Sequence, residues 1–466
     1  MTRKELQHDL INDYKANNPK SFKLFQKNSD CLIKGGSHNA RLFSPFPFYD
    51  AQCSGSKVKD IDGNTYIDFW QGHYVNILGH NPEPVLSALI KYMQQGGGLQ
   101  TGFPGTHQGE LARFIIKCTG ADRIRFTTSG TLATMYAIML SRAFTGKDLV
   151  LKVGGGWHGS QPFVLKGTFT YDKGFNYLES RGLLPETDKI IHVIRFNDIN
   201  DLEEKFKKNG DRISCFIIEA CIGVGGFIFA SKEYLKRARE LCTSHGALLI
   251  IDEVISGFRF HPGGLQSLYG MKPDLTVFGK VIGGGMPVSA VCGREDVMSQ
   301  CSPDRDPDEL VQFNGGTYSA HPASMLAGYT FITYLKEHAK EIYPKIGRLG
   351  KIAREGIEEI FTTHGFNVRC TGHPNGVTEY SSLLGVHFLK DTIDRLDSPD
   401  QAWNPEICDI ELREEIFKLE MLKEGFHIMH GYGGISAAHT EEEIQASLDA
   451  VERIALRWKK YNIPRS

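Results

Sequence analysis

The sequence has no uninterrupted apolar run of the ~20 residues that a membrane-spanning helix needs. Its N-terminus, Met1-Thr2-Arg3-Lys4-Glu5, leads into a polar stretch and lacks the apolar core of a secretion signal. The net charge is only −2 over 466 residues, and basic residues form no long run. We therefore expect neither a membrane nor a nucleic acid as a partner, and we interpret the protein as cytoplasmic.

The ten cysteines form no Cys-x-x-Cys pair, and several lie in apolar stretches, such as Cys215. This pattern is typical of buried free thiols in a reducing compartment and predicts no metal site. The chain also lacks the Gly-x-x-x-x-Gly-Lys-Ser/Thr loop of nucleotide-binding proteins. Hydrophobic residues make up 41%, so a sizeable core is expected instead of disorder.

A length of 466 residues predicts two or three lobes that fold together. Between about residues 91 and 330, short apolar runs alternate with helical segments, which predicts an α/β domain with a mostly parallel central sheet flanked by helices. The expected strands are Ile124–Thr127, Leu149–Val153, Cys215–Glu219, Ala247–Asp252, Leu275–Phe278 and Ser289–Cys292.

Residues 1–90 are expected to form an N-terminal segment, and residues 331–466 a smaller C-terminal domain that packs with it. Residues 1–30 predict one polar amphipathic helix, and residues 57–68 predict a hairpin with an Asp62-Gly63-Asn64 turn. Toward the C-terminus we expect a strand at Leu384–Phe388 and a final helix from Thr440.

Three local patterns carry the chemistry. After the strand that ends at Thr127, Ser129-Gly130-Thr131 opens a helix, where free N–H groups bind anions. An ordinary Ser/Thr helix cap is the more frequent meaning of that pattern alone. Asp252 and Glu253 follow an apolar strand, where an acid needs a partner such as a pyridinium nitrogen. A magnesium site is the alternative there.

The third pattern is a lone lysine, Lys280, which ends a strand within an apolar and glycine-rich stretch. Burial lowers the pKa of a lysine and makes its amine a nucleophile toward carbonyls, whereas a lysine that reaches the surface would be inert. A phosphate-binding helix start, an acid after one strand and a lysine after the next are together what bound pyridoxal 5′-phosphate requires.

From about Gly35 to Glu443, the sequence resembles the fold-type I, class-III aminotransferases, and most closely their glutamate-1-semialdehyde aminomutase-like branch. The matching motifs are Ile77-Leu78-Gly79-His80, Ser129-Gly130-Thr131, Trp157-His158-Gly159, Phe196-Asn197-Asp198, Ile251-Asp252-Glu253-Val254, Phe278-Gly279-Lys280-Val281-Ile282-Gly283-Gly284-Gly285, Gly316-Thr317-Tyr318-Ser319 and Ser436-Ala437-Ala438-His439-Thr440. The resemblance implies a large α/β domain and a smaller α+β domain built from both chain ends.

The resemblance also implies residue roles. Lys280 would form the Schiff base with pyridoxal phosphate and move the substrate proton, and Asp252 would pair with the pyridinium nitrogen. The other expected cofactor-binding residues are Ser129, Gly130 and Thr131 at the phosphate, Trp157 and Val254 on the two ring faces, His158, Glu219, and Thr317. Thr317 would reach the phosphate of a partner subunit, which implies a homodimer with shared active sites.

Toward the substrate, the resemblance places Arg41 where relatives grip a carboxylate, and His73 where the mutases usually have tryptophan. Asn197, from its matching motif, is expected on the same side. A surface arginine and a loop histidine are the plain alternatives. The segment His427–Ser436 is shorter than in the mutases and lacks their glutamate, and Leu132 replaces a family glutamate. The run Asn39–Pro47 resembles aminotransferases that act on β-amino acids.

The leading hypothesis is amino transfer from an amino acid or amine to a keto acid. An intramolecular aminomutase and an epimerase are the alternatives on the same scaffold, and stoichiometry distinguishes them. A nicotinamide oxidoreductase has only the incomplete motif Gly223-Val224-Gly225-Gly226 in its favour. A non-catalytic ligand-binding relative would not need Lys280, Asp252 and Thr317 together.

Overall fold

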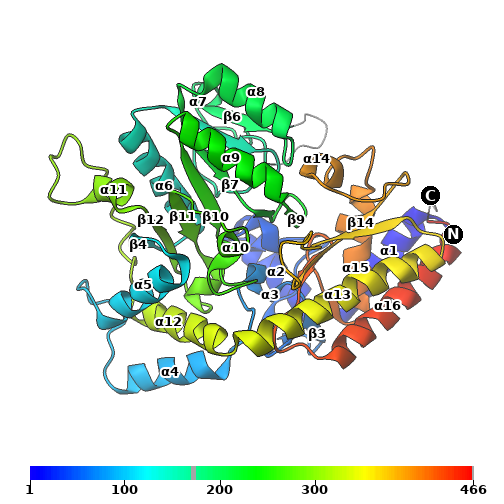
Figure 1. The fold of residues 1–466 in the computed structure, drawn as a ribbon. Coiled ribbons are helices and arrows are strands. Elements are labelled where there is room, and N and C mark those ends of the chain that lie inside the picture. Colours follow the sequence, from blue (N-terminus) through cyan, green and yellow to red (C-terminus); the bar gives the residue numbers. More distant parts are fainter. Residues whose placement is uncertain (169–174, 464–466) are drawn as a thin grey trace.

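The computed structural model describes residues 1–168 and 175–463. Its centre is a seven-stranded sheet with the order β4-β12-β11-β10-β7-β5-β6 (Figure 1). The strands are β4 (Arg123–Thr127), β5 (Leu149–Val153), β6 (Ile191–Ile194), β7 (Ile213–Ile218), β10 (Leu248–Glu253), β11 (Leu275–Phe278) and β12 (Ser289–Gly293). The five from β11 to β6 run parallel, whereas β12 is antiparallel to both neighbours. The predicted mostly parallel sheet is confirmed, and β6 was not predicted.

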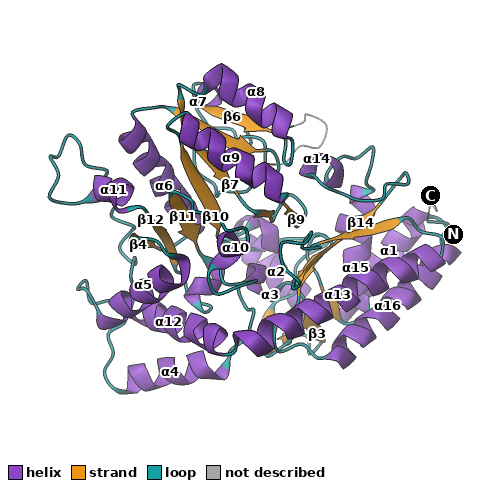
Figure 2. Ribbon diagram, viewed as in Figure 1, coloured by secondary structure: helices purple, strands orange, loops and turns teal. Residues whose placement is uncertain are grey.

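Helices cover both faces of this sheet (Figure 2). Alternate side chains of a strand point to opposite faces. On β10, Ile250 belongs to the apolar cluster that includes α6 (Gly130–Thr145). Its neighbours Leu249 and Ile251 belong to the cluster on the other face, together with α9 (Lys232–Ser244). Burial on both faces explains why these strands read as continuous apolar runs.

The first thirty residues form two helices, α1 (Arg3–Asn17) and α2 (Pro19–Ser29), and the prediction of a single helix was wrong. Pro19 has no N–H for the helical hydrogen bond and clashes with the preceding turn, so a new helix begins there. The predicted hairpin is confirmed as β2 (Lys57–Asp60) and β3 (Thr65–Asp68), and an unpredicted strand, β1 (Asp50–Ser54), extends it.

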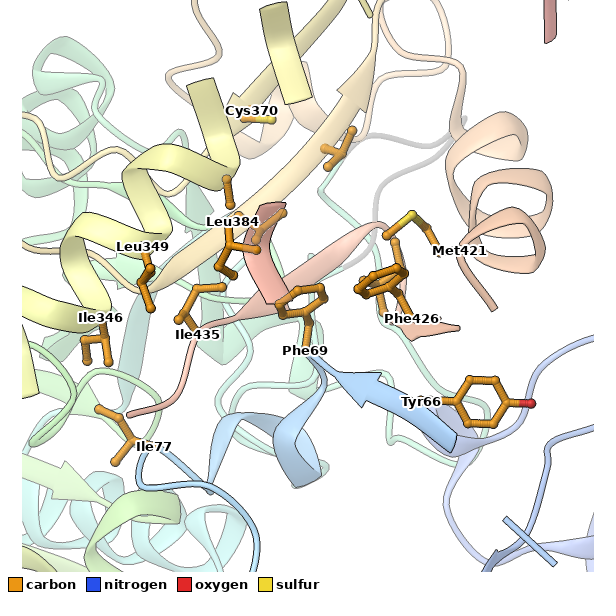
Figure 3. Packing of buried hydrophobic residues seen from close by; sticks show 14 of the residues in the cluster. Tyr66, Phe69, Ile77, Ile346, Leu349, Cys370, Leu384, Met421, Phe426 and Ile435 are labelled. Atoms are coloured by element: carbon orange, nitrogen blue, oxygen red, sulfur yellow. The ribbon is translucent and has the colours of Figure 1, made fainter. Parts of the chain in front are cut away.

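The two chain ends pack together on the side of the molecule away from β4 (Figure 1). Strand β3 pairs in parallel with β15 (Phe426–His427), and α1 packs on α15 (Lys418–Lys423). An Arg3–Asp409 ion pair with an N···O distance of 2.6 Å also joins α1 to the C-terminal part of the chain. Figure 3 shows Phe69 beside Phe426 in the shared core. The proposed domain boundaries, residues 90 and 330, fall inside α4 (Glu83–Gln94) and α12 (Pro322–Glu337) and stay a prediction.

Two long helices, α13 (Ala339–Thr363) and α16 (Glu441–Lys460), complete the C-terminal part. The remaining larger elements are α5 (Thr106–Thr119), α8 (Ile199–Asn209), β13 (Val368–Thr371), β14 (Leu383–Phe388) and β16 (Tyr432–Gly434). Trp458 of α16 is fully buried, and its ring centroid lies 5.1–5.3 Å from those of Phe361 and Phe388. None of the described helices has the length and apolar character needed to cross a membrane.

Replacing Trp458 with alanine should lower the free energy of unfolding by ~3–5 kcal/mol, because the change empties a closely packed aromatic site. Leu456→Ala on the same helix should change it by less than ~0.5 kcal/mol, because Leu456 is exposed. Denaturant unfolding monitored by circular dichroism measures both values. Equal values for the two variants would contradict this account of the core.

Candidate active site

Asp252 and Lys280 leave the sheet at the same edge. Strands β10 and β11 are parallel neighbours, with Asp252 opposite Val277. Lys280 comes after the end of β11, separated from it only by Gly279. Lys280 begins a short 3₁₀ turn, η3 (Lys280–Gly283), with a φ of +48°. A non-glycine residue in this left-handed region is uncommon, and such residues cluster at functional sites.

Lys280 is only partly accessible, and burial lowers the pKa of its amine. The carboxylates of Asp252 and Glu219 act in the opposite direction, and the guanidinium of Arg259 adds to the lowering. The result is an amine that loses its proton more readily than a surface lysine, as a nucleophile toward a carbonyl requires.

Asp252 is held by two donors. His158 Nδ1 lies 2.8 Å from its Oδ2, and the backbone N–H of Val254 donates to its Oδ1 at 2.9 Å. Burial lowers the pKa of His158, so the ring is neutral with its proton on Nδ1, facing the carboxylate. The carbonyl of His158 in turn accepts a 2.6 Å hydrogen bond from Thr134 of α6. The acid, the loop and the helix are therefore fixed relative to one another.

Glu219 also holds the Trp157-His158-Gly159 loop. Its two carboxylate oxygens accept the N–H groups of Trp157 at 2.9 Å and Gly223 at 3.0 Å. Burial, followed by the charge of Asp252, raises the pKa of Glu219 to about 8. Its observed contacts are to the backbone, and a role at the cofactor stays a prediction.

Lys152, which the sequence analysis did not single out, holds the same loop through hydrogen bonds. Its buried ammonium donates to the carbonyls of Gly156, Val164 and Lys166 at 2.7–3.2 Å. Burial lowers its pKa to about 7. Because β5 is a continuous apolar strand in the sequence, only the folded loop reveals what this lysine binds.

The helix start behaves both as a cap and as an open anion site. Ser129 Oγ accepts the N–H of Leu132 at 3.3 Å, as an ordinary N-cap does. Among the described residues, the N–H groups of Gly130 and Thr131 have no acceptor. A Cβ on Gly130 would lie 3.1 Å from Val254, so this glycine and Val254 lie directly against each other.

The predicted substrate residues Arg41 and His73 meet: Arg41 Nε lies 3.2 Å from His73 Nε2. Burial lowers the pKa of His73 to about 3, and neighbouring positive charges act in the same direction. These neighbours are His38, Arg41, Lys280 and His430. Residues Gln71–Tyr74, which include His73, also pack against η3, so Lys280 lies on the same side of the molecule as Arg41. Two histidines that the sequence analysis did not single out, His38 and His430, also act on His73.

His430 is paired with Glu414, with 2.5 Å between Nδ1 and Oε2. Glu414 lies in a π-helical turn, η5 (Leu412–Phe417), which faces the segment 427–436. The segment 427–436 itself lacks a glutamate, but the fold brings Glu414 into contact with His430 of that segment. No signal in the sequence links residues 414 and 430, because their contact depends on the tertiary fold.

Two predicted residues have other partners. Asn197 donates to the carbonyls of Phe229 and Asp397 and accepts the N–H of Ser231, so its side chain joins three backbone segments. A substrate role for Asn197 stays a prediction that these contacts do not require. Thr317 is exposed, and its carbonyl accepts from Gln100.

The competing motifs have structural explanations. Gly223–Gly226 connects the two short strands of a hairpin, β8 (Cys221–Ile222) and β9 (Ile228–Phe229), so no helix follows it to bind a dinucleotide. Glu253 accepts the N–H of Gln266 at 2.7 Å and the hydroxyl of Ser256, away from Asp252's partners. Within residues 1–168 and 175–463, no group of three His, Cys, Asp or Glu side chains could hold a metal ion.

Comparison with known proteins identifies the family. Residues 41–379 match the sequence model of the aminotransferase class-III family. The chain belongs to this family. The class-III aminotransferases depend on pyridoxal 5′-phosphate, so this protein is an enzyme of the transaminase or aminomutase kind with that cofactor. The buried amine, the acid and the open helix start fit the aldehyde, the ring nitrogen and the phosphate.

The class-III chain is similar along its whole length to enzymes of both kinds. It is 33% identical over 435 residues to a glutamate-1-semialdehyde 2,1-aminomutase from Methanobrevibacter smithii, which covers 92% of this chain and 96% of that protein. A β-phenylalanine aminotransferase structure from Variovorax paradoxus has a TM-score of 0.86 and 27% identity, with 99% of each chain covered. A transaminase structure with bound cofactor has a TM-score of 0.82 and 30% identity, with 94% and 98% covered.

Gly159 provides a test of this site. Its φ is +91°, and an added Cβ would lie 2.5 Å from Thr131 Oγ1, which would push the loop off the helix start. Gly182 has a φ of +92° but open space around it. Gly159→Ala should therefore weaken pyridoxal phosphate binding by about tenfold or more, equivalent to ~1.4 kcal/mol, whereas Gly182→Ala should leave it close to wild type. Fluorescence titration of the apoprotein measures both affinities. Equal losses would show that backbone strain alone is responsible.

Proposed function

We propose that this class-III enzyme is an aminotransferase that moves an amino group from a carboxylate-bearing donor, of the β-amino acid kind, to a keto acid such as 2-oxoglutarate or pyruvate. The observation that carries the proposal is the placement of Arg41 and His73 on the same basic side as Lys280. An arginine with a free guanidinium fork suits a carboxylate. Similarity to the β-phenylalanine aminotransferase over 99% of both chains supports this donor class.

Each residue of the site would have a separate role. Pyridoxal phosphate supplies an electron sink for the bond-breaking steps at the carbon that bears the amine. Lys280 would hold the cofactor aldehyde through Nζ and later carry the substrate proton at the same atom. Asp252, fixed by His158, would keep a proton on the ring nitrogen. The N–H groups of Gly130 and Thr131 would bind the phosphate, and Trp157 and Val254 would flank the ring.

An aminomutase is the second candidate, because the curated relatives at 32–33% identity that cover more than 90% of the chain are glutamate-1-semialdehyde aminomutases. The segment 427–436 favours transfer, since the resemblance places a glutamate of the mutases in this segment and the chain has none there. Mixing the holoenzyme with 3-amino-3-phenylpropanoate in the absence of a keto acid distinguishes the two reactions. A transferase stops after one amino group per site, with a lasting change in the visible spectrum, whereas a mutase or epimerase continues to turn over its own substrate.

Lys280→Ala should abolish amino transfer, because it removes the amine that we propose holds the cofactor and moves the proton. Borohydride reduction followed by peptide mapping should place a pyridoxyl group on Lys280 of the wild type. The control is Lys166→Met, which removes a second buried lysine that is ion-paired with Asp188, and it should keep the label at position 280. A label on any other residue of the wild type, or transfer activity in Lys280→Ala, would disprove the role.

We also propose a homodimer. Large apolar side chains are exposed on α4, in the loop that follows it and in the loop before α12, and exposed apolar side chains in such numbers favour an interface. They are Leu86, Ile90, Met93, Leu99, Phe103 and Tyr318, with Phe103 79% exposed. Thr317 lies beside Tyr318 in this surface and near Gln100, as expected if it reaches the site of a second copy.

Phe103→Glu should shift the protein from dimer toward monomer, because it places a charge in the proposed interface, and it should reduce the cofactor content through the loss of Thr317 from the partner's site. Leu456→Glu, on α16 at the opposite side of Figure 1, adds the same charge to another exposed leucine and should stay dimeric. Light scattering after size-exclusion chromatography reads out the mass. A monomeric wild type would refute the proposal.

A further inference from the structure

The four residues Gln71–Tyr74, which include His73, form an unusual turn. Helix α3 (Gln71–Tyr74) is left-handed, with φ values of +50°, +58°, +63° and +66°. Three of its four residues are not glycine, and such a conformation persists only where the surroundings enforce it, at ~1–3 kcal/mol for each residue. Strained backbone of this kind clusters at functional sites, which makes this turn a candidate for function.

Contacts at both ends enforce the turn. Asp68 accepts the N–H groups of Trp70 and Gln71 at 2.9 Å each, and Gln71 Nε2 donates to the carbonyl of Gly434 at 2.7 Å. At the other end, the fully buried guanidinium of Arg259 donates to the carbonyl of Tyr74. The turn also packs against η3, which contains Lys280. Its third residue, His73, is therefore held in one place beside the site.

The ring of His73 is fixed as well. Its centroid lies 4.3 Å from that of Trp70 and 4.7 Å from that of His38, so the ring cannot turn freely. Nε2 accepts a hydrogen bond from Arg41, which requires a neutral ring with its proton on Nδ1. Burial lowers the pKa of His73, and the neighbouring charges of His38, Arg41, Lys280 and His430 act in the same direction.

Arg41 is exposed and bonded only through Nε. In the part of the chain that the structure describes, neither terminal amino group of its guanidinium has an acceptor. Because the guanidinium is planar, a bond at Nε sets the plane of the whole fork. The fork is therefore oriented while both of its outer N–H pairs stay open, which is the arrangement that a carboxylate with two oxygens needs.

We infer that His73 is a positioning residue, whose neutral ring orients the guanidinium of Arg41 to bind the carboxylate of the amino donor. The inference rests on the proposed function and deepens it, since it names the residue that orients the arginine toward the carboxylate of the donor. His73 acts through Arg41 and does not itself bind the donor. A tryptophan at this position, as in the mutases, has no ring acceptor and could not hold the arginine in this way.

The first test measures equilibrium binding of 3-phenylpropanoate, a carboxylate without an amino group, to the holoenzyme by calorimetry. His73→Phe keeps a flat ring but removes the acceptor, and it should raise the Kd about tenfold. His73→Gln places an acceptor at the reach of Nε2 and should restore the Kd to within about threefold of wild type. His73→Asn, which readily adopts the left-handed backbone but is too short to reach Arg41, should resemble His73→Phe. Unchanged melting temperatures and cofactor absorption confirm the fold.

The second test is a double-mutant cycle with Arg41→Met. If His73 acts only through Arg41, the double variant Arg41→Met/His73→Phe should have the same Kd as Arg41→Met alone. Additive losses would show direct contact with the carboxylate and overturn the inference. A wild-type Kd for His73→Phe would overturn it too, as would a wild-type holoenzyme that does not bind 3-phenylpropanoate.

Turnover supplies an independent readout. The ratio of kcat/KM for 3-amino-3-phenylpropanoate to that for 1-phenylethylamine, which lacks the carboxylate, should fall about tenfold in His73→Phe, mainly through KM for the acid. An unchanged ratio would contradict the inference. Labelling of Lys280 and the single-turnover experiment do not depend on His73, so the proposed function can hold while this inference fails. Failure of those two experiments, with the binding results for the His73 variants as expected, would instead refute the proposed function alone.

Discussion

The buried carboxylate of Asp252 is the contact on which the geometry of the site depends. An isolated charge at the end of an apolar strand would be costly, and two donors from outside the strand stabilise it. One of them, His158, belongs to a loop that Glu219 and Lys152 also anchor. This one acid therefore fixes the positions of β10, the Trp157 loop and the start of α6 relative to one another. Lys280, just after the neighbouring strand β11, completes the site.

The parts of the fold that the sequence predicted are those with local causes. Five of the six predicted strands are buried on both faces, so their apolar character is visible in the residues themselves, whereas the sixth, β4, is only partly buried at the sheet edge. Strand β6, at the other edge of the sheet, was missed because His192 interrupts its short apolar run, and His192 and Val193 are only partly buried. The break at Pro19 was likewise predictable from proline chemistry, but the amphipathic pattern on both sides of it hid the boundary.

The site divides in the same way. Lys280 and Asp252 could be found from sequence because an ionisable side chain within an apolar run is conspicuous. His38, His430, Glu414 and Arg259 could not, because each acquires its meaning from a segment far away in the chain. Asn197 was suggested by a matching motif, and the motif does not reveal that its amide connects three stretches of backbone; its substrate role stays a prediction.

The pairing of β3 with β15 has a consequence for the order of assembly during synthesis. Asp68, which anchors the turn that carries His73, bonds to His427, 359 residues later. A nascent chain that has reached residue 330 already contains the whole seven-stranded sheet, Lys280 included, but not the strand that seats this turn. The amine that we propose as catalytic is thus synthesised before the strand that seats the turn, and this turn can adopt its folded contacts only after roughly the last tenth of the polypeptide has been made.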